Sequence, residues 1–302
     1  MSQRELSDLK LSEPQTATLD VPGAVLTYDV RANDASTRPA LLLIGSPMGA
    51  AGFATQAGHF ADRTVVTYDP RGSERSRRTD GAAESTPAEH ADDLYRLIMT
   101  ATTGAVDVFA SSGGAVNALA LVAAHPGLVR TVVAHEPPVF AELPDRDAAM
   151  AASTAIRATY QRRGMGPAMA MFIALVSLEG PIPAGFGDGP EPDPTVFGLP
   201  TEDDGSRDDP LLGQNMVTCT HHRPDFAALR AAATRIVVGI GATSGSMLPG
   251  RAAAAVAARL GVEPVTFPGG HDGFLGGEYG GMGEPDAFAA TLRQVLDDRP
   301  RA

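Results

Sequence analysis

The chain has 302 residues, of which 43% are hydrophobic, and it carries a formal net charge of −12. This length accommodates one large α/β domain or two modest ones, and the hydrophobic content is ample for a core. The negative charge and the lack of a basic patch argue against nucleic acid as a partner.

Cys219 is the only cysteine, which excludes a disulfide within the chain and makes a reducing compartment the default expectation. Residues 1–13 are polar and lack the apolar segment of a signal peptide. No apolar run approaches the roughly 20 residues that span a bilayer. We therefore expect a soluble, cytoplasmic protein without membrane contact, and the sequence leaves its oligomeric state open.

The first predicted elements are two strands, at residues 16–20 and 24–30, joined in a hairpin by the turn signal Pro22-Gly23. Continuous apolar runs at 40–44 and 64–68 follow, as expected for strands that are covered on both faces. A helix is expected between them, from 53 to 61. Thr86-Pro87-Ala88-Glu89 combines an N-cap, a first-turn proline and a capping acid, and predicts a helix to about residue 100.

Strands and helices then continue to alternate on both sides of an interruption. Before it the expected elements are a strand at 106–110, a helix at 115–124 and a strand at 129–135, and after it a strand at 235–241, a helix at 251–260, a strand at 264–267 and a helix at 284–298. This spacing predicts an α/β fold with a mostly parallel central sheet and helices on both faces.

The interruption, residues 139–232, holds helical patterns at 147–162 and 168–178 and a long loop rich in Pro, Gly and Asp at 180–210. A loop of that length inside a compact domain is typical of a functional cover or a mobile segment. We interpret the segment as a helical lid inserted into a core formed by residues 1–138 and 233–302.

A candidate nucleophile lies where the strand at 106–110 meets its helix, in Ala110-Ser111-Ser112-Gly113-Gly114. A side chain at the apex of such a strand–turn–helix corner needs small residues two places before and after it. Ser112 meets this condition, whereas Ser111 would place Phe109 in one of those positions. His271, in the glycine-rich loop after the last strand, is the best candidate among seven histidines for the base that activates Ser112.

An oxyanion formed at Ser112 needs two backbone N–H donors. Gly113 follows the nucleophile directly and supplies one. The second is expected from the loop after residues 40–44, where we favour Ser46, because Gly45 permits the turn and Pro47 has no N–H.

With these motifs the chain resembles the α/β-hydrolase fold superfamily, in particular its serine esterases and lipases. The resemblance rests on four segments that occur in the family's order, namely Ile44-Gly45-Ser46-Pro47, Tyr68-Asp69-Pro70-Arg71-Gly72-Ser73, Ala110 to Gly114, and Gly270-His271-Asp272-Gly273-Phe274. It implies that Asp69 and Arg71 fix a loop and that a lid follows the strand after the nucleophile.

The sequence departs from the family pattern where the acid of the catalytic triad belongs. The loop after residues 235–241 reads Gly241-Ala242-Thr243-Ser244-Gly245-Ser246 and contains no carboxylate. Glu136, at the end of the strand after the nucleophile, is the best substitute, since some relatives keep their acid there. Ser244 and then Asp272 are the alternatives.

The most plausible activity is hydrolysis of an ester or related acyl compound, a small molecule, by Ser112, His271 and Glu136 without a cofactor or metal. Met165, Met169 and Phe172 in the insertion are candidate substrate contacts, because thioethers adapt to irregular apolar ligands. The alternative is a cyclase, lyase or carbon–carbon bond-cleaving enzyme of the same fold, acting on a small polyketide-like molecule. A ligand-binding relative without catalysis is a third possibility.

Overall fold

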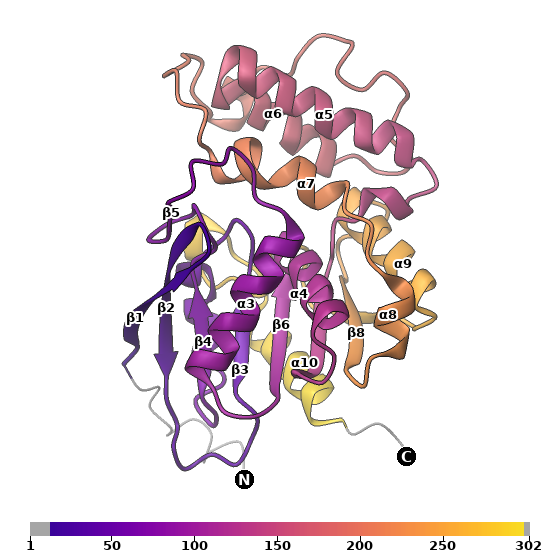
Figure 1. Cartoon of the computed structure of the whole chain (residues 1–302). Coiled ribbons are helices and arrows are strands. Elements are labelled where there is room, and N and C mark those ends of the chain that lie inside the picture. The colour runs from indigo at the N-terminus through magenta and orange to yellow at the C-terminus, as the bar shows by residue number, and fades with distance from the viewer. Residues whose placement is uncertain (1–12, 299–302) are drawn as a thin grey trace.

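One sheet runs through the computed structural model, which describes residues 13–298 and shows nine strands in that range (Figure 1). The segment used to judge a signal peptide lies outside the described residues, apart from Glu13. The strands are β1 (Gln15–Val21), β2 (Ala24–Arg31), β3 (Leu41–Ile44), β4 (Val65–Tyr68), β5 (Arg77–Arg78), β6 (Val106–Ser111), β7 (Val129–His135), β8 (Arg235–Gly241) and β9 (Val265–Phe267).

The strand order is β1-β2-β4-β3-β6-β7-β8-β9, with β5 paired to the edge of β2. The pairs from β4 to β9 are all parallel, while β1 with β2 and β2 with β4 are antiparallel. The predicted hairpin at the start of the chain is therefore confirmed, and so is the mostly parallel sheet.

Helices cover both faces of this sheet, because alternate side chains of each strand point to opposite sides. Leu42 and Ile44 of β3 pack on the side of the helices at 87–101, 113–124, 226–231 and 248–260. Leu41 and Leu43 pack on the side of the helices at 54–58 and 285–297. Continuous apolar strands are thus explained by burial on two sides.

The helices begin and end close to the predicted boundaries. They are α2 (Ala54–Gly58), α3 (Pro87–Ala101), α4 (Gly113–Ala124), α5 (Arg146–Arg163), α6 (Met165–Val176), α7 (Met216–Thr220), α8 (Phe226–Ala231), α9 (Leu248–Leu260) and α10 (Pro285–Asp297). Thr86 and Glu89 form the predicted capping box of α3. The helix expected at 53–61 is shorter, because Phe53 belongs to a 3₁₀ turn, η1 (Ala50–Phe53), and α2 already ends at Gly58.

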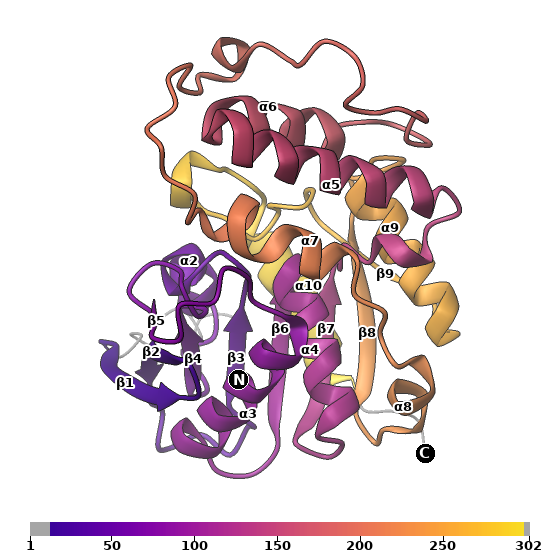
Figure 2. The same ribbon diagram turned by 45° about the horizontal axis from the view of Figure 1, so that its top comes forward.

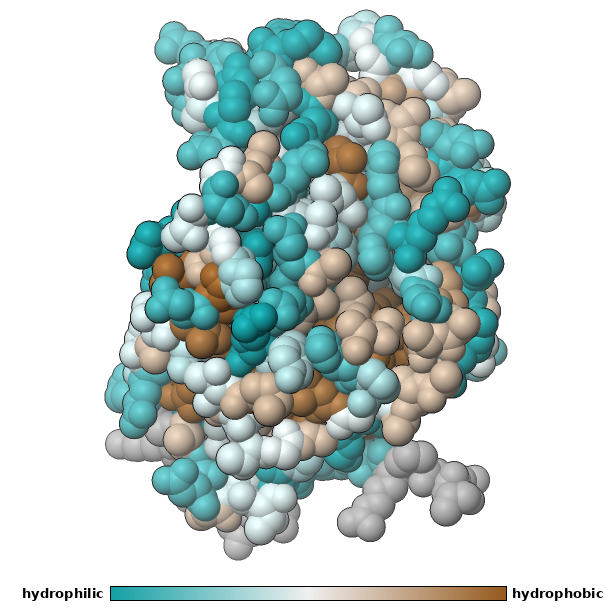
Figure 3. All heavy atoms as spheres, viewed as in Figure 1, coloured by the Kyte–Doolittle hydropathy of each residue, from teal (hydrophilic) through white to brown (hydrophobic). Residues whose placement is uncertain are grey.

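The segment between β7 and β8 lies over the carboxyl ends of the central strands, with α5 and α6 side by side above the sheet (Figures 1 and 2). Its interior is a separate apolar cluster that includes Ile156, Tyr160, Met171 and Leu212. Hydrophilic residues cover much of its outer surface on the face seen in Figure 3. The helical pattern of this segment is confirmed, while its role as a lid and its limits at 139 and 232 stay predictions.

The last helix of that segment, α8, packs beside the sheet rather than over it, because Phe226 and Leu229 join the core cluster with α4 and α9. The long loop predicted at 180–210 is present and contains one 3₁₀ turn, η3 (Pro194–Phe197). Within residues 13–298, no helix combines the length and apolar character needed to cross a lipid bilayer.

Candidate active site

Ser112 stands alone between the end of β6 and the start of α4, with φ 55° and ψ −128°. A positive φ strains a residue that has a Cβ, and such strain is typical of a nucleophile at a strand–helix corner. Its N–H donates to the carbonyl of His135 at 3.0 Å, which anchors the corner to β7. Ser111 is 2% exposed, whereas Ser112 is partly exposed.

The two glycines after Ser112 allow the oxyanion loop to approach it. A Cβ on Gly113 would lie 2.6 Å from the carbonyl oxygen of Ser46, and one on Gly114 would lie 2.7 Å from that of Ile44. Neither contact is tolerated by a real side chain. The sequence requirement for a small residue two places after the nucleophile therefore has a direct cause, namely contact with the loop after β3.

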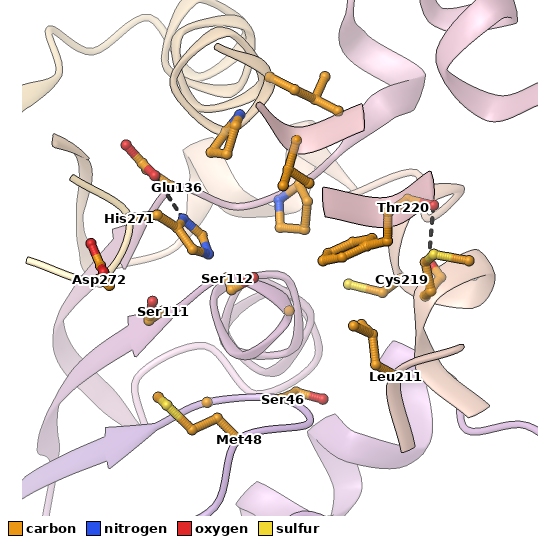
Figure 4. A pocket seen from close by; sticks show the side chains of 18 of the residues that line it. Ser46, Met48, Ser111, Ser112, Glu136, Leu211, Cys219, Thr220, His271 and Asp272 are labelled. Carbon is orange, nitrogen blue, oxygen red and sulfur yellow. Dashed lines mark hydrogen bonds and ion pairs between the residues drawn. The ribbon is translucent and has the colours of Figure 1, made fainter. Parts of the chain in front are cut away.

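His271 lies in the loop between β9 and α10, and its side chain is 42% exposed. Backbone contacts between glycines bring this loop against the end of β8, since a Cβ on Gly241 would lie 2.6 Å from the carbonyl carbon of Gly270. The N–H of Thr243 also donates to Gly269 O at 2.9 Å. In Figure 4 the imidazole of His271 lies between Glu136 and Ser112, with one nitrogen turned toward each.

Glu136 follows β7 and is fully buried, with φ 48°. Its Oε2 lies 2.7 Å from Nδ1 of His271, and its Oε1 accepts the N–H of Gly241 at 2.9 Å. Its own N–H donates to Gly239 O at 3.0 Å, so the backbone is held by β8. Both carboxylate oxygens are thus engaged, and the side chain is oriented toward the imidazole.

The carboxyl group of Glu136 is held in its ionised form. Burial alone would raise its pKa, but the hydrogen bond and the electrostatic interaction with His271 outweigh that cost, with smaller contributions from His135 and Ser244, and the pKa falls to about 2. A carboxylate charged at neutral pH stabilises an imidazolium beside it. The pair therefore has the electrostatics of an acid that assists a histidine base.

The two alternatives to Glu136 are not bonded to the imidazole. Ser244 is 1% exposed and lies in the loop after β8, close to Glu136 but without the geometry of a regular hydrogen bond among the described residues. Asp272 is exposed. Nδ1 of His271 is already taken by Glu136. Ser244 thus lies beside the carboxylate, and Asp272 lies at the surface.

Ser46 lies in the loop after β3 and lines the same cavity as Ser112. This loop is held in place by Asp69, whose Oδ1 accepts the N–H of Ala50 at 2.8 Å and whose Oδ2 binds Arg75. Arg71 is buried and paired with Asp93. Asp69 and Arg71 therefore have the loop-fixing contacts that were expected of them.

A cavity of about 580 Å³ opens over Ser112, between the sheet and the helical insertion. Phe172 lines it, as does Val176 one turn further along α6. The structure does not bring Met165 and Met169 to it, and this corrects their assignment as substrate contacts; they pack against the apolar cluster inside the insertion. They lie about 10 Å and 5 Å before Phe172 along the helix axis, beyond the end of the cavity.

Several lining residues had no signal in the sequence. Leu211, Cys219 and Thr220 lie across Ser112 from His271 (Figure 4). They belong to η4 (Pro210–Asn215), a π-helical turn, and to α7. Both elements are too short for a clear periodicity, so only their packing over the sheet reveals their place.

His135 is the buried histidine that sequence reasoning treated only as the end of a strand. Its ring lies 6.2 Å from that of His271, centre to centre, and is surrounded by phenylalanines. Burial lowers its pKa to about 4. Neither ring nitrogen has a hydrogen-bond partner within residues 13–298, so it acts as a neutral aromatic side chain beneath the site.

The remaining observations concern metal binding and the histidine at the end of α7. Among the described residues, no group of three or more His, Cys, Asp or Glu side chains is placed to hold a metal ion. His221 lies 2.8 Å, through Nε2, from the hydroxyl of Ser153 in α5. This histidine therefore ties α7 to α5.

The fold of the chain is similar to that of several solved structures. A thermophilic esterase from Thermogutta terrifontis has a TM-score of 0.65 and 19% identity, over 94% of this chain and 98% of that one. An enol-lactonase from Burkholderia xenovorans has a TM-score of 0.62 and 17% identity, over 93% and 100%. The chain has the α/β-hydrolase fold.

Similarity in sequence covers a smaller part of the chain than similarity in structure does. An uncharacterised hydrolase of Bacillus subtilis, YraK, is 40% identical over 122 residues, which are 40% of this chain and 44% of that protein. The match thus spans less than half of that relative's length. No protein-family model matches the sequence.

Proposed function

We propose that this α/β-hydrolase-fold protein is a serine hydrolase that cleaves carboxylic esters. The observation that supports this best is the 2.7 Å contact between Glu136 Oε2 and His271 Nδ1, with the imidazole turned toward Ser112 (Figure 4). An imidazole that donates through Nδ1 to a carboxylate keeps Nε2 free to accept a proton from a hydroxyl.

In the first half of the reaction, Oγ of Ser112 attacks the ester carbonyl carbon while Nε2 of His271 takes the hydroxyl proton. The carbonyl oxygen becomes an oxyanion, which the N–H groups of Gly113 and Ser46 stabilise, helped by the positive end of α4. The carbon–oxygen bond to the alcohol then breaks, and His271 gives its proton to the departing alkoxide. The acyl group remains on Ser112.

Water completes the cycle. It attacks the acyl carbon as His271 accepts one of its protons, and a second oxyanion forms in the same place. The bond to Ser112 Oγ breaks, Ser112 regains a proton from His271, and the carboxylic acid leaves. Glu136 stays ionised throughout and stabilises the imidazolium in both halves.

The assignment to esters follows from the neighbours as well as from the site. The solved structures are named as an esterase and an enol-lactonase, and a lactone is a cyclic ester. The relative with the higher sequence identity is named as a hydrolase. Since shared fold does not fix function, we extend these activities to this chain only because His271 contacts Glu136 and its imidazole is turned toward Ser112 (Figure 4).

The test is covalent labelling and burst kinetics. A fluorophosphonate probe should label the wild-type protein and Ser111→Ala but not Ser112→Ala. Ser111 is the matched control, because it is the adjacent serine but is buried. p-Nitrophenyl acetate should give a burst of nitrophenolate of about one equivalent per active site. Labelling of Ser112→Ala, or its unchanged ester turnover, would refute the proposal.

The alternative activity was that of a cyclase, a lyase or a carbon–carbon bond-cleaving enzyme. It was considered because the loop after β8 contains no carboxylate. Glu136 holds a carboxylate at the position where that acid would act, so this reason no longer favours it. A protein without a burst and without a covalent adduct, but with activity that depends on His271, would revive it.

A further inference from the structure

Much of the cavity wall is apolar. Phe172, Leu211 and Met216 contribute side chains from the helical insertion, and Met48 and Leu275 contribute them from the sheet side. Burying aliphatic or aromatic groups of a ligand against such a wall is favourable by about 25 cal/mol per Å² of apolar area. The wall therefore selects by apolar contact.

Two polar side chains of the insertion that reach the cavity, those of Asn215 and Thr220, are already bonded within the protein, while a third, Ser177, is exposed. Asn215 has Oδ1 2.8 Å from Nε2 of His90 and donates through Nδ2 to Pro210 O at 2.8 Å. The hydroxyl of Thr220 donates to Met216 O at 2.8 Å. Burial raises the pKa of the Cys219 thiol to about 12, so it stays neutral. None of these groups requires a polar partner on the substrate.

The charged side chains that line the cavity in the free protein are negative. Among the described residues that line it, none is Lys or Arg, and the two acidic ones are Glu136 and Asp272. Glu136 is paired with His271, and Asp272 adds an exposed carboxylate near the site. A carboxylate on the substrate would lose its hydration against the apolar wall without gaining a cation, and this loss is unfavourable.

We infer that the site takes uncharged esters whose acyl chain is apolar, and that it rejects esters with a carboxylate at the far end of that chain. The acyl chain lies against Phe172, Leu211 and Met216, and the ester carbonyl lies over Ser112. This inference rests on the proposed serine hydrolase activity and specifies its substrate class.

Three esters with the same leaving group and a six-carbon acyl chain test this. They are p-nitrophenyl hexanoate, the mono-p-nitrophenyl ester of adipic acid, and its uncharged methyl p-nitrophenyl diester. The second differs from the first in carrying a terminal carboxylate, and the third masks that charge. The hydrolysis rate measured with Ser112→Ala is subtracted as background. The kcat/KM of the monoester should then be at least 100-fold lower than that of the hexanoate, and the kcat/KM of the diester should lie within tenfold of that of the hexanoate.

The outcomes separate the substrate class from the chemistry. Hydrolysis of the monoester within threefold of the hexanoate would overturn the inference while leaving the serine mechanism intact. If kcat/KM fell as much for the diester as for the monoester, the site would be rejecting a polar chain end rather than a charge. That result would also overturn the inference. No turnover of any ester by folded protein would refute the proposed function, and the inference with it.

A gain-of-function variant adds a second readout. Leu211 is partly exposed at the cavity wall, so a guanidinium there retains some hydration. Leu211→Arg should raise the ratio of monoester to hexanoate kcat/KM at least tenfold over Leu211→Gln, which supplies a neutral polar side chain. An equal ratio in the two variants would contradict the role assigned to charge.

Discussion

The N–H of Gly241, the last residue of β8, donates a 2.9 Å hydrogen bond to Oε1 of Glu136, which follows β7. The loop after β8 has no carboxylate, but the end of β8 thus binds and orients the carboxylate of Glu136, which follows the adjacent strand β7. The other oxygen, Oε2, remains free to meet His271 Nδ1 at 2.7 Å. The carboxylate thus reaches His271 from the strand next to the one after which the resemblance to the family predicts an acid.

Glu136→Gln should lower kcat/KM by about 10³- to 10⁴-fold, because the amide cannot stabilise the imidazolium or fix its tautomer. The substitution keeps the shape of the side chain, so the protein should remain folded by circular dichroism. Asp272→Asn is the matched control and should stay within threefold of wild type. A larger loss in Asp272→Asn than in Glu136→Gln would reverse their assignment.

Gly113→Ala should lower kcat about 100-fold or more with little change in KM, because the new Cβ would lie 2.6 Å from Ser46 O and displace an oxyanion donor. Gly58→Ala is the control, since it is an exposed glycine of α2 whose added Cβ meets no atom within 4 Å. Ester turnover under saturating substrate measures the effect. Full activity in Gly113→Ala would argue against Gly113 and Ser46 as the oxyanion donors.

Phe172→Ala and Met169→Ala compare two large side chains of α6, of which only the first lines the cavity. Phe172→Ala should lower kcat/KM for p-nitrophenyl hexanoate about tenfold through lost apolar contact. Met169→Ala should leave it within twofold and instead lower the free energy of unfolding by about 1 kcal/mol. The reverse pattern would restore Met169 as a substrate contact.

The stability of the protein should fall in mild acid because of His135. In the unfolded chain its imidazole titrates near 6.5, whereas burial lowers the native pKa to about 4. The unfolded state therefore binds the proton first as pH falls. Above pH 6.5 the ring is neutral in both states and does not affect the free energy of unfolding. That free energy falls progressively as the pH drops from 6.5 to 4.

His135→Phe isolates this effect, since phenylalanines already surround the ring. The loss of unfolding free energy between pH 7 and pH 4.5 should be about 2 kcal/mol smaller in the variant than in wild type. Urea denaturation at the two pH values measures it. His90, whose pKa burial also lowers to about 4, remains in both proteins and cancels in the comparison. An unchanged pH dependence would contradict the prediction.

The sequence by itself determined the features that depend on neighbouring residues. Alternating apolar strands and helices predict the parallel sheet, because burial on two faces demands such runs. The serine at the corner could be chosen from Ala110 and Gly114 alone, since steric crowding there is local. Thr86 and Glu89 specified the start of α3 through bonds made within one turn.

Only the tertiary structure decided which acid reaches the histidine. Glu136 and His271 are 135 residues apart, and their contact depends on how the glycine loops after β8 and β9 pack together. It also decided the cavity wall, because Phe172 and Met169 lie three residues apart on one helix and only Phe172 lines the cavity. Sequence patterns report interactions between residues that are close together in the chain, whereas these contacts depend on how whole helices, strands and loops pack in space.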